Sequence, residues 1–359
     1  MRGTSERLPV RAGGRIISFL PSAHVADRWS AHYWCSLCLG FTVTCVTDLR
    51  TVVEHLPEVR PTVWGAVPRI WEKIKAALEA QGIVDPSVLA AEQRSAIRAK
   101  LGLDQTECLV VGAAPTAREV LEYFDALGLP ICELWGMSEL SCCVTINPPE
   151  RIRIGTCGPP IEGAELRIAD DGEVLVRGPL VMAGYRNDPE KTSETIDPDG
   201  WLRTGDVGEL DEDGYLTIVD RKKELIINAA GKNMSPANIE SRLKTANPLI
   251  GQCMCIGDRR PYNVALIVLD PDACAAHGRA RGLEDASASA LATSDDVQAL
   301  VAKAVEEANS HLSRVEQVKR FTILATDWLP DSDELTPTMK LKRKPIERKY
   351  ASEIDSLYT

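Results

Sequence analysis

Residues 107–139 read ECLVVGAAPTAREVLEYFDALGLPICELWGMSE, and this stretch decides the fold. Its apolar run at 109–111 predicts a short buried strand, and a second run at 130–134 predicts another. Between them we expect a helix, because Thr116 can cap its start with Glu119 as the capping-box partner. A strand, a helix and a second strand form a β-α-β unit, which indicates the α/β class.

The loops that follow these two strands are candidate binding sites, because ligands of open α/β sheets collect at the carboxyl ends of the strands. The first loop has small side chains that let its backbone approach a flat ring, and it consists of Gly112, Ala113, Ala114 and Pro115. In the second loop, Trp135 offers a stacking face, Ser138 a hydroxyl for a phosphate oxygen and Glu139 a hard carboxylate for Mg²⁺. Two plainer interpretations stay open: an ordinary strand-to-helix turn for the first loop, and a helix cap for the Ser-Glu pair.

The pattern of the chain changes at residues 220–223, DRKK. Residues 200–219, GWLRTGDVGELDEDGYLTIV, predict short antiparallel strands joined by tight turns at their Asp-Gly pairs. Residues 236–244, PANIESRLK, predict an amphipathic helix. Four consecutive charged residues do not fit a core strand, so we place a domain boundary there, between residues 1–219 and 220–359.

Composition restricts the class of protein. The chain has 359 residues, enough for two domains, and 44% hydrophobic and 26% charged residues are typical of a globular protein. No apolar run approaches the roughly 20 residues of a membrane-spanning helix, and the N-terminus lacks a signal-peptide core, so we expect a cytoplasmic protein. A net charge of −11 argues against nucleic acid as a partner.

Eleven cysteines raise the question of a disulfide or zinc site. Cys35 and Cys38 have C-x-x-C spacing, but they stand in the apolar run YWCSLCLGFTVTCV without a second ligand pair at metal spacing. We therefore predict reduced thiols in the core.

Three further residues could carry chemistry. Asp206, between Gly205 and Val207 at a predicted strand end, can accept hydrogen bonds from vicinal hydroxyls such as those of a ribose, although a solvated turn aspartate is the alternative. His24 in PSAHVADR is a single histidine, which is more often structural. Lys340 lies in the basic end ELTPTMKLKRKPIERKY, for which a nucleic-acid or membrane tail is the competing interpretation.

Read together, four motifs resemble, in order and separation, those of the adenylate-forming superfamily: WGMSE (135–139), GWLRTGDVG (200–208), DRKKELIINAAGKNMSP (220–236) and TPTMKLKR (336–343). Two earlier stretches resemble its long-chain fatty-acyl-CoA synthetase branch: LPSAHVADR (20–28) and EVRPTVWGAVPRIWEKI (58–74). The resemblance covers nearly the whole chain. It implies the C-terminal part of a large adenylate-forming domain, with β-α-β layers and a small β subdomain, followed by a small mobile α+β domain.

The resemblance also implies the chemistry: a fatty acid and Mg·ATP give acyl-AMP, which then reacts with CoA. It assigns catalysis to Lys340, His24 and Glu139, with Glu139 as the metal ligand. It assigns nucleotide binding to Gly112, Ala113, Ala114, Pro115, Trp135, Gly136, Ser138, Asp206 and Arg221. His24 is placed at the mouth of an acyl tunnel, which Trp29, Trp34 and Phe41 could line or merely support as core. Lys223 is placed at the hinge and Gly231 in a tight loop near the site.

This chain departs from the family pattern at one motif. The Ser/Thr/Gly-rich triphosphate loop that ends in Pro-Lys-Gly should precede His24, where this chain has only RAGGR. We therefore expect a chain that begins within the large domain, and impaired adenylation if no other polypeptide supplies that loop.

Three hypotheses remain open. The first is a working ligase, with or without a separate N-terminal half; the second is a non-catalytic remnant that binds AMP or acyl groups. The third is an acyl-AMP ligase that serves a carrier protein, against which the match of residues 20–28 counts. The other basic residues of the tail could contact CoA phosphates, a membrane surface or water, and they are Lys342, Arg343, Lys344, Arg348 and Lys349.

Overall fold

The computed structural model describes residues 1–228, 232–336 and 339–359, and it divides the chain into two compact units, Met1–Val219 and Asp220–Thr359. The strands of the first unit are β1 (Arg15–Ser18), β2 (Thr42–Cys45), β3 (Val63–Ala66), β4 (Cys108–Val111), β5 (Ile131–Trp135), β6 (Thr145–Ile146), β7 (Glu165–Ile168), β8 (Glu173–Arg177), β9 (Leu202–Leu210) and β10 (Leu216–Arg221), whose last two residues belong to the second unit.

The helices of the first unit are α1 (Arg2–Arg7), α2 (Val25–Asp27), η1 (Arg28–Cys38), η2 (Leu49–His55), α3 (Leu56–Val59), α4 (Pro68–Glu79), η3 (Pro86–Val88), α5 (Ala91–Leu101), α6 (Arg118–Ala126), η4 (Ser138–Leu140), η5 (Pro149–Arg151) and α7 (Pro189–Thr195). Of these, η1 is a π-helix, and η2, η3, η4 and η5 are 3₁₀-helices.

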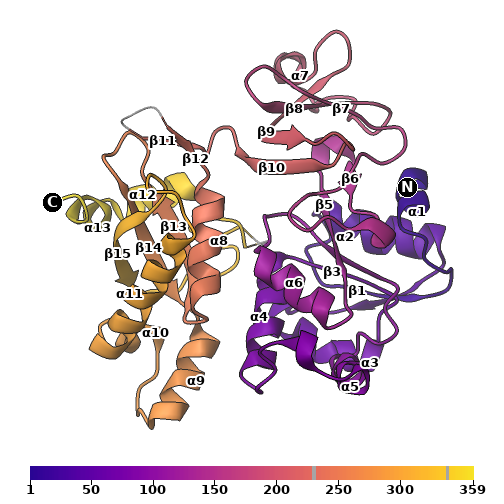
Figure 1. Cartoon of the computed structure of the whole chain (residues 1–359). Helices are drawn as coiled ribbons and strands as arrows, with labels where there is room; N and C mark the ends of the chain where they lie inside the picture. The colour runs from indigo at the N-terminus through magenta and orange to yellow at the C-terminus, as the bar shows by residue number, and fades with distance from the viewer. Residues whose placement is uncertain (229–231, 337–338) are drawn as a thin grey trace. The chain divides into compact units, whose positions relative to one another are not determined.

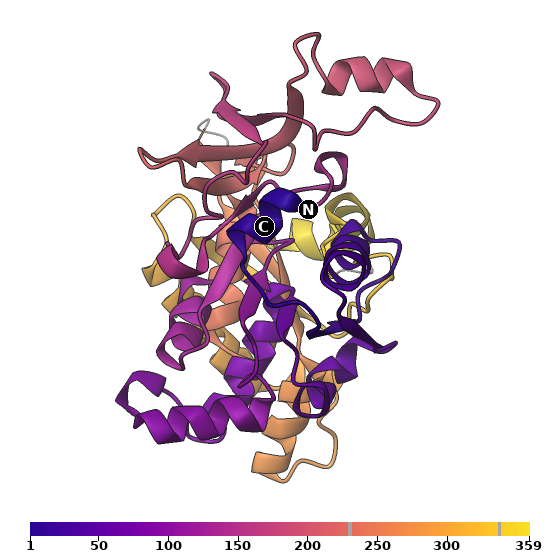
Figure 2. The ribbon, with the colours of Figure 1, turned by 90° about the vertical axis from the view of Figure 1, so that its right-hand side faces the viewer.

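Three sheets organise the first unit. The sheet β3-β4-β5-β6 is parallel from β3 to β5 and antiparallel at β6. The sheet β10-β9-β8-β7 is antiparallel at its β7/β8 and β8/β9 pairs, and β1 and β2 form a separate parallel pair. Figure 2 shows α7 on a loop at the far end of the β7 to β10 sheet.

The core of the first unit forms where α4 and α6 pack side by side against the parallel strands (Figure 1). Trp71 of α4 is fully buried, and its ring meets Trp64 of β3 edge-on at 4.6 Å and Phe124 of α6 at 4.9 Å. These aromatic contacts add to apolar burial, and they fix both helices on the sheet that carries the candidate loops.

The predicted β-α-β unit is present as β4, α6 and β5, but the predicted cap is wrong. Helix α6 begins at Arg118, after Ala117, which makes no side-chain cap bond. Ala117 is buried in the core, so packing sets the start of the helix two residues beyond Thr116.

The boundary at residues 220–223 was placed because charged residues do not fit a core strand, and this argument was wrong for Asp220. Asp220 lies in β10 and is only 5% exposed. Its carboxylate accepts hydrogen bonds from the Ser235 hydroxyl at 2.5 Å and the Ala237 backbone N–H at 3.1 Å. A charged residue is therefore buried here because hydrogen-bond donors satisfy it.

The second unit is an α+β layer structure. Its strands are β11 (Ile226–Ile227), β12 (Asn233–Met234), β13 (Ile250–Ile256), β14 (Asn263–Leu269) and β15 (Val318–Leu324). Its helices are α8 (Pro236–Ala246), α9 (Pro271–Arg281), α10 (Ala288–Leu291), α11 (Asp295–Ser310), α12 (Arg343–Lys349) and α13 (Ala351–Ser356).

Strand β14 is the centre of this unit, paired antiparallel with β13 and parallel with β15. All seven of its residues are buried, and its alternate side chains enter two different clusters. One cluster includes α8 and α11, and the other includes α12 and α13. A strand covered on both faces is apolar throughout, as NVALIVL is.

Seven of the eleven cysteines are buried, as predicted for core thiols, whereas Cys38 and Cys45 are exposed. No helix in the described part of the chain is both long and apolar enough to span a bilayer.

Candidate functional site

The two candidate loops lie at the same edge of one sheet. Strands β4 and β5 are parallel neighbours, with Leu109 opposite Ile131, so their carboxyl ends point the same way. Gly112 has no room for a side chain, because an added Cβ would stand 2.7 Å from a methyl group of Leu134. Ala113 has φ +73°, a conformation uncommon outside glycine, and the loop residues 113–115 are exposed. The predicted first loop is thus close-packed against β5 and open to solvent at its tip.

The most informative contact of the site joins Trp135 to Asp206, 71 residues apart. The indole Nε1–H donates to Asp206 Oδ2 at 2.7 Å. Both side chains are buried, at 8% and 5% exposure. The backbone N–H of Asp206 donates to Thr204 Oγ1 at 3.1 Å. A carboxylate held in this way is pre-oriented for a ligand that donates hydrogen bonds.

Most of the Trp135 face lies against protein. The ring packs in a cluster with Leu140, Val144 and Val174, so its clearest role in the structure is to hold Asp206. The sequence indicated both residues as ligand contacts, but it did not indicate that Trp135 holds the Asp206 carboxylate.

Ser138 and Glu139 lie on the 3₁₀-helix η4, whose N-cap is Met137 without a side-chain bond. Ser138 is exposed, and the Glu139 carboxylate accepts the Tyr185 hydroxyl at 2.9 Å through Oε1. Gly136 permits the loop, because an added Cβ would stand 1.9 Å from the Cys142 carbonyl oxygen. The interpretation of the Ser-Glu pair as a side-chain cap of this helix is therefore not supported.

The donor set fits a metal that is held mainly by ligands other than protein. Among the described residues there is no group of three or more His, Cys, Asp or Glu side chains that could hold a metal ion. Glu139 supplies one hard carboxylate, and Tyr185 orients it. Mg²⁺ commonly takes one or two carboxylates and completes its shell with water and phosphate oxygens.

A buried carboxylate that sequence reasoning missed stands on β5. Glu133 is 8% exposed, and burial raises its pKa to about 7. Its Oε2 accepts the Gly155 N–H at 2.8 Å, and its backbone carbonyl accepts the Asn147 N–H at 3.0 Å. The signal was available, since ICELW places a single carboxylate in an otherwise apolar strand.

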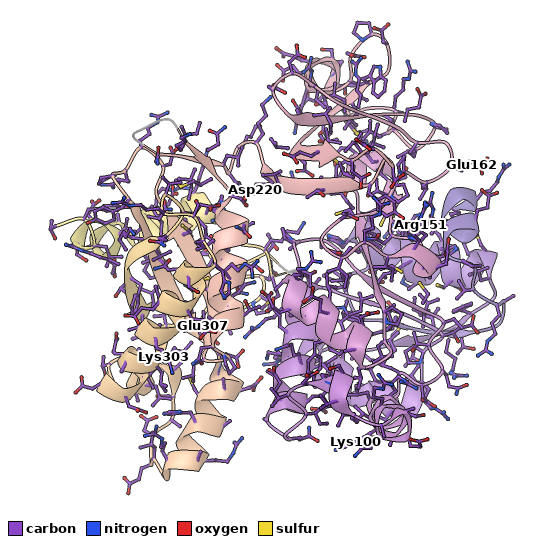
Figure 3. All side chains as sticks on the ribbon, in the orientation of Figure 1. Lys100, Arg151, Glu162, Asp220, Lys303 and Glu307 are labelled. Atoms are coloured by element: carbon purple, nitrogen blue, oxygen red, sulfur yellow. The ribbon has the colours of Figure 1, made fainter. Side chains whose placement is uncertain are left out.

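Asn147 completes the anchoring of the loop at 151–156. Its Oδ1 accepts the Arg153 N–H at 3.0 Å, and its amide nitrogen donates to the Thr156 carbonyl. Arg151, labelled in Figure 3, donates to the Tyr215 hydroxyl at 2.9 Å. The loop is thereby fixed between β5 and the sheet that carries Asp206.

His24 occupies the N-cap of α2, where its Nδ1 accepts the Ala26 N–H at 3.2 Å. Helix α2 continues into the π-helix η1, a type found mostly as short insertions and often at functional sites. Trp34 and Phe41 are 2% and 6% exposed and belong to the core, and Trp29 stacks on Trp34 at 5.6 Å. Of the two roles that the sequence allowed, lining a tunnel or forming core, Trp34 and Phe41 have the core role.

The remaining predicted residues belong to the second unit, and those that the structure describes are exposed. Arg221 ends β10, and its carbonyl accepts the N–H groups of Glu224 and Leu225 at 2.9 and 3.0 Å, which closes the turn that contains Lys223. Arg221 and Lys223 are exposed. Gly231 lies outside the described residues.

Lys340 is exposed, and its backbone N–H donates to Thr336 Oγ1 at 3.0 Å. The tail that follows is not a plain basic surface. Arg343 binds Glu240 at 2.6 and 2.9 Å, and Lys349 binds Glu334 at 2.5 Å. These two residues form ion pairs within the unit, although the sequence left them open to phosphates, lipid or water.

The comparisons with known proteins identify the family and the fold. A family model described as AMP-binding enzyme matches residues 2–186, and one described as AMP-binding enzyme C-terminal domain matches residues 223–359. A protein of Mycobacterium tuberculosis (strain CDC 1551 / Oshkosh) named as a fatty-acid–CoA ligase, fadD11, is 50% identical over 389 aligned positions, which cover 98% of this chain and 68% of the relative. The long-chain-fatty-acid–CoA ligase FadD15 of Mycobacterium bovis is 38% identical, with 97% of this chain and 63% of the relative covered.

Among solved structures, the fold matches the A domain of carboxylic acid reductase from Segniliparus rugosus, determined with AMP and a co-purified carboxylic acid. The TM-score is 0.78 at 22% identity, over 99% of this chain and 58% of that one. The chain thus spans between about half and two thirds of the length of these proteins. The family models, the relatives and the adenylate-forming fold lead to one conclusion: this chain belongs to the AMP-binding enzyme family.

Proposed function

We propose that the chain activates a long-chain fatty acid with ATP, first to an acyl-adenylate with release of pyrophosphate and then to an acyl-CoA with release of AMP. The observation that carries this proposal is the Trp135–Asp206 hydrogen bond, at the sheet edge that also bears Ser138 and Glu139. Such an edge can bind a nucleotide through its ribose and its phosphates at once. The names of FadD11 and FadD15 support the acyl substrate and the CoA acceptor.

In the first step, each residue acts on a different part of ATP. The Asp206 carboxylate accepts hydrogen bonds from the ribose hydroxyls, and Arg221 is the second ribose contact. The loop from Gly112 to Pro115 lies along adenine with Gly136 behind the phosphates, while Ser138 donates to a phosphate oxygen. Lys340 places its ammonium at the α-phosphate and the fatty-acid carboxylate, where negative charge shifts during attack.

Mg²⁺, held by Glu139, neutralises phosphate charge when it is bound. For the second step, we assign Lys223 the hinge of the C-terminal unit and His24 the entrance of the acyl chain beside the adenylate. Fatty acid, ATP and CoA are then the small-molecule partners.

Fatty-acid-dependent exchange of labelled pyrophosphate into ATP tests the first step. We expect exchange in the wild type with Mg²⁺ and a long-chain acid, and a loss of roughly 10- to 100-fold in Asp206→Asn. Asp199→Asn, an exposed change of the same kind on a neighbouring turn, should leave the exchange unchanged. Exchange that is equal in Asp206→Asn and wild type would remove Asp206 from the site.

A second candidate function is a half-enzyme or non-catalytic remnant that binds AMP or acyl groups. The separate β1-β2 pair favours it, because parallel strands are usually covered on both faces, yet Thr42 and Cys45 of β2 are exposed. Leu37 of the adjacent η1 is 75% exposed. A separate polypeptide equivalent to the front third of FadD11 is the partner that this candidate requires.

Adding that front third in trans distinguishes the candidates. The half-enzyme predicts pyrophosphate exchange only in the mixture, and the remnant predicts AMP binding by calorimetry without exchange in either case. Exchange by the chain alone contradicts both.

A further inference from the structure

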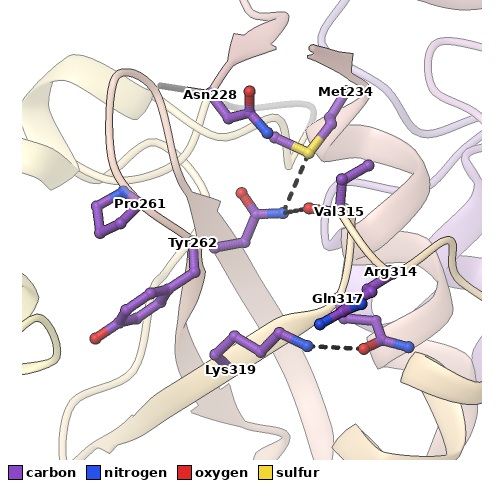
Figure 4. Close-up of a pocket in the computed structure, with 9 residues that line it drawn as sticks. Asn228, Met234, Pro261, Tyr262, Arg314, Val315, Gln317 and Lys319 are labelled. Atoms are coloured by element: carbon purple, nitrogen blue, oxygen red, sulfur yellow. Dashed lines mark hydrogen bonds between the residues drawn. The ribbon is translucent and has the colours of Figure 1, made fainter. Parts of the chain in front are cut away.

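The second unit contains a pocket of about 180 Å³ between the start of β14, the start of β15 and the turn that precedes β15 (Figure 4). Its polar lining consists of Asn228, Tyr262, Asn263, Arg314, Gln317 and Lys319. Pockets for drug-sized ligands measure roughly 300–1,000 Å³, so this one suits a single functional group of a ligand.

The turn that carries Arg314 is held by the side-chain amides of two asparagines, one of them buried. Asn263 is 1% exposed, and its Nδ2 donates to the carbonyls of Val315 at 3.1 Å and Glu316 at 3.0 Å. Asn263 in turn needs a glycine beside it, because a Cβ at Gly257 would stand 1.9 Å from its Oδ1. The backbone of the turn is therefore pre-organised before a ligand binds.

A second amide fixes the other end of the same turn. Asn309 at the end of α11 exchanges two hydrogen bonds with the backbone of Val318, at 2.8 and 2.9 Å. Its carbonyl accepts the Gln317 amide at 3.1 Å. Glu316, the acidic residue of the turn, is half-buried and accepts the N–H and the hydroxyl of Ser313 at 3.1 and 2.6 Å.

The charge of the pocket is positive and uncompensated. No Asp or Glu lines it, and within the described residues the Arg314 guanidinium meets neither a carboxylate nor another hydrogen-bond acceptor. The Lys319 ammonium donates to the neutral Gln317 Oε1 at 2.8 Å, as Figure 4 shows. Two cations with neutral amides beside them are suited to an anion, and the fork of arginine matches phosphate oxygens.

We propose that this pocket binds a phosphate monoester group and that the 3′-phosphate of CoA is its source. The chemistry of the lining selects the phosphate, whereas the choice of CoA rests on the proposed function. A site in the C-terminal unit that holds the nucleotide end of CoA would contribute affinity without taking part in bond making or breaking.

Calorimetric titration of the full chain with CoA, 3′-dephospho-CoA and inorganic phosphate tests the proposal, because equilibrium binding does not require turnover. We expect CoA to bind about tenfold more tightly than 3′-dephospho-CoA. Arg314→Gln and Lys319→Gln should each remove this difference. The matched controls are Arg279→Gln and Lys303→Gln, which remove the same charges from exposed positions on α9 and α11.

Each outcome decides between the sources. Phosphate binding that is lost in Arg314→Gln, with CoA and 3′-dephospho-CoA equally tight, keeps a phosphate pocket and excludes CoA as its source. Equal binding of all three probes by Arg314→Gln, Arg279→Gln and wild type overturns the proposal. A wild type that binds CoA in an Arg314-dependent manner but shows no pyrophosphate exchange upholds the pocket and counts against the proposed catalytic function alone.

Discussion

At the scale of single residues, the site depends on buried polar side chains with defined partners. The sequence indicated Trp135 and Asp206 separately, although it placed Asp206 at the end of a strand, whereas Asp206 lies inside β9. It could not indicate their hydrogen bond, because a contact over 71 residues follows from the packing of two sheets. Glu133 and Tyr185 were missed for the same reason, since neither belongs to the motif that it supports.

Removing the indole donor should weaken nucleotide binding as well as folding. Trp135→Phe leaves the Asp206 carboxylate buried without its 2.7 Å donor, so we expect a loss of about 2 kcal/mol in the free energy of unfolding and about tenfold weaker AMP binding. Urea denaturation and calorimetry with AMP measure the two effects.

Trp64→Phe is the matched control for this change. Trp64 is fully buried, and its Nε1 finds no hydrogen-bond partner among the described residues, so the substitution removes ring volume but no hydrogen bond. Unchanged AMP affinity in Trp135→Phe, or an equal loss in Trp64→Phe, would contradict the positioning role.

Glu133 should make stability depend on pH. Its pKa is about 7 in the folded chain and near 4.5 when unfolded, so burial costs nothing below about pH 4.5, where both states are protonated. As the pH rises from 4.5 to 7 the unfolded state loses its proton first, and the folded state becomes less stable by about 3 kcal/mol at most.

Glu133→Gln removes this charge and keeps an acceptor for Gly155. The variant should match the wild type near pH 4 and exceed it in the free energy of unfolding near pH 8, as measured by urea denaturation across that range. The exposed Glu194→Gln should show no such crossover. A difference between Glu133→Gln and wild type that stays constant with pH would refute the assignment.

At the scale of elements, local sequence predicted which strands and helices exist better than where they begin. Strands β4 and β5 follow apolar runs that sequence patterns detect. The start of α6 and the burial of Asp220 depend on tertiary neighbours: Ala117 docks into a core, and Ser235 and Ala237 approach a strand end from elsewhere in the chain. The loop before η4 requires a glycine at position 136, because an added Cβ would stand 1.9 Å from the carbonyl oxygen of Cys142, which lies outside the motif.

Gly136→Ala tests this loop. The new methyl group would overlap the Cys142 carbonyl, so η4 must move, with a cost of about 1–3 kcal/mol and a roughly 100-fold fall in adenylation from displaced Ser138 and Glu139. Pyrophosphate exchange and urea denaturation measure the two effects. Gly214→Ala has φ +78° with open space around it, and should cost stability without affecting exchange. Normal exchange in Gly136→Ala would show that the loop tolerates the displacement.

At the scale of the whole molecule, the chain is two units that each have hydrophobic clusters of their own. Motif order was enough to predict the family and the adenylate-forming fold, because motifs preserve residue types at fixed positions. The pocket at Arg314 was not predictable in this way, since it arises where Asn263 of β14 and Asn309 of α11 fix one turn. The proposed chemistry requires residues of both units, and Lys340 is the residue proposed to stabilise charge at the reacting α-phosphate and carboxylate.

The most direct test measures fatty-acid-dependent AMP release by the purified chain with Mg·ATP and CoA, over a range of acyl lengths, beside Lys340→Ala. We expect release with long-chain acids and a fall of about 100- to 1,000-fold in the variant, because one charge that stabilises the transition state is removed. Release that is equal in Lys340→Ala, or no release from wild-type protein shown to be folded, would contradict the account.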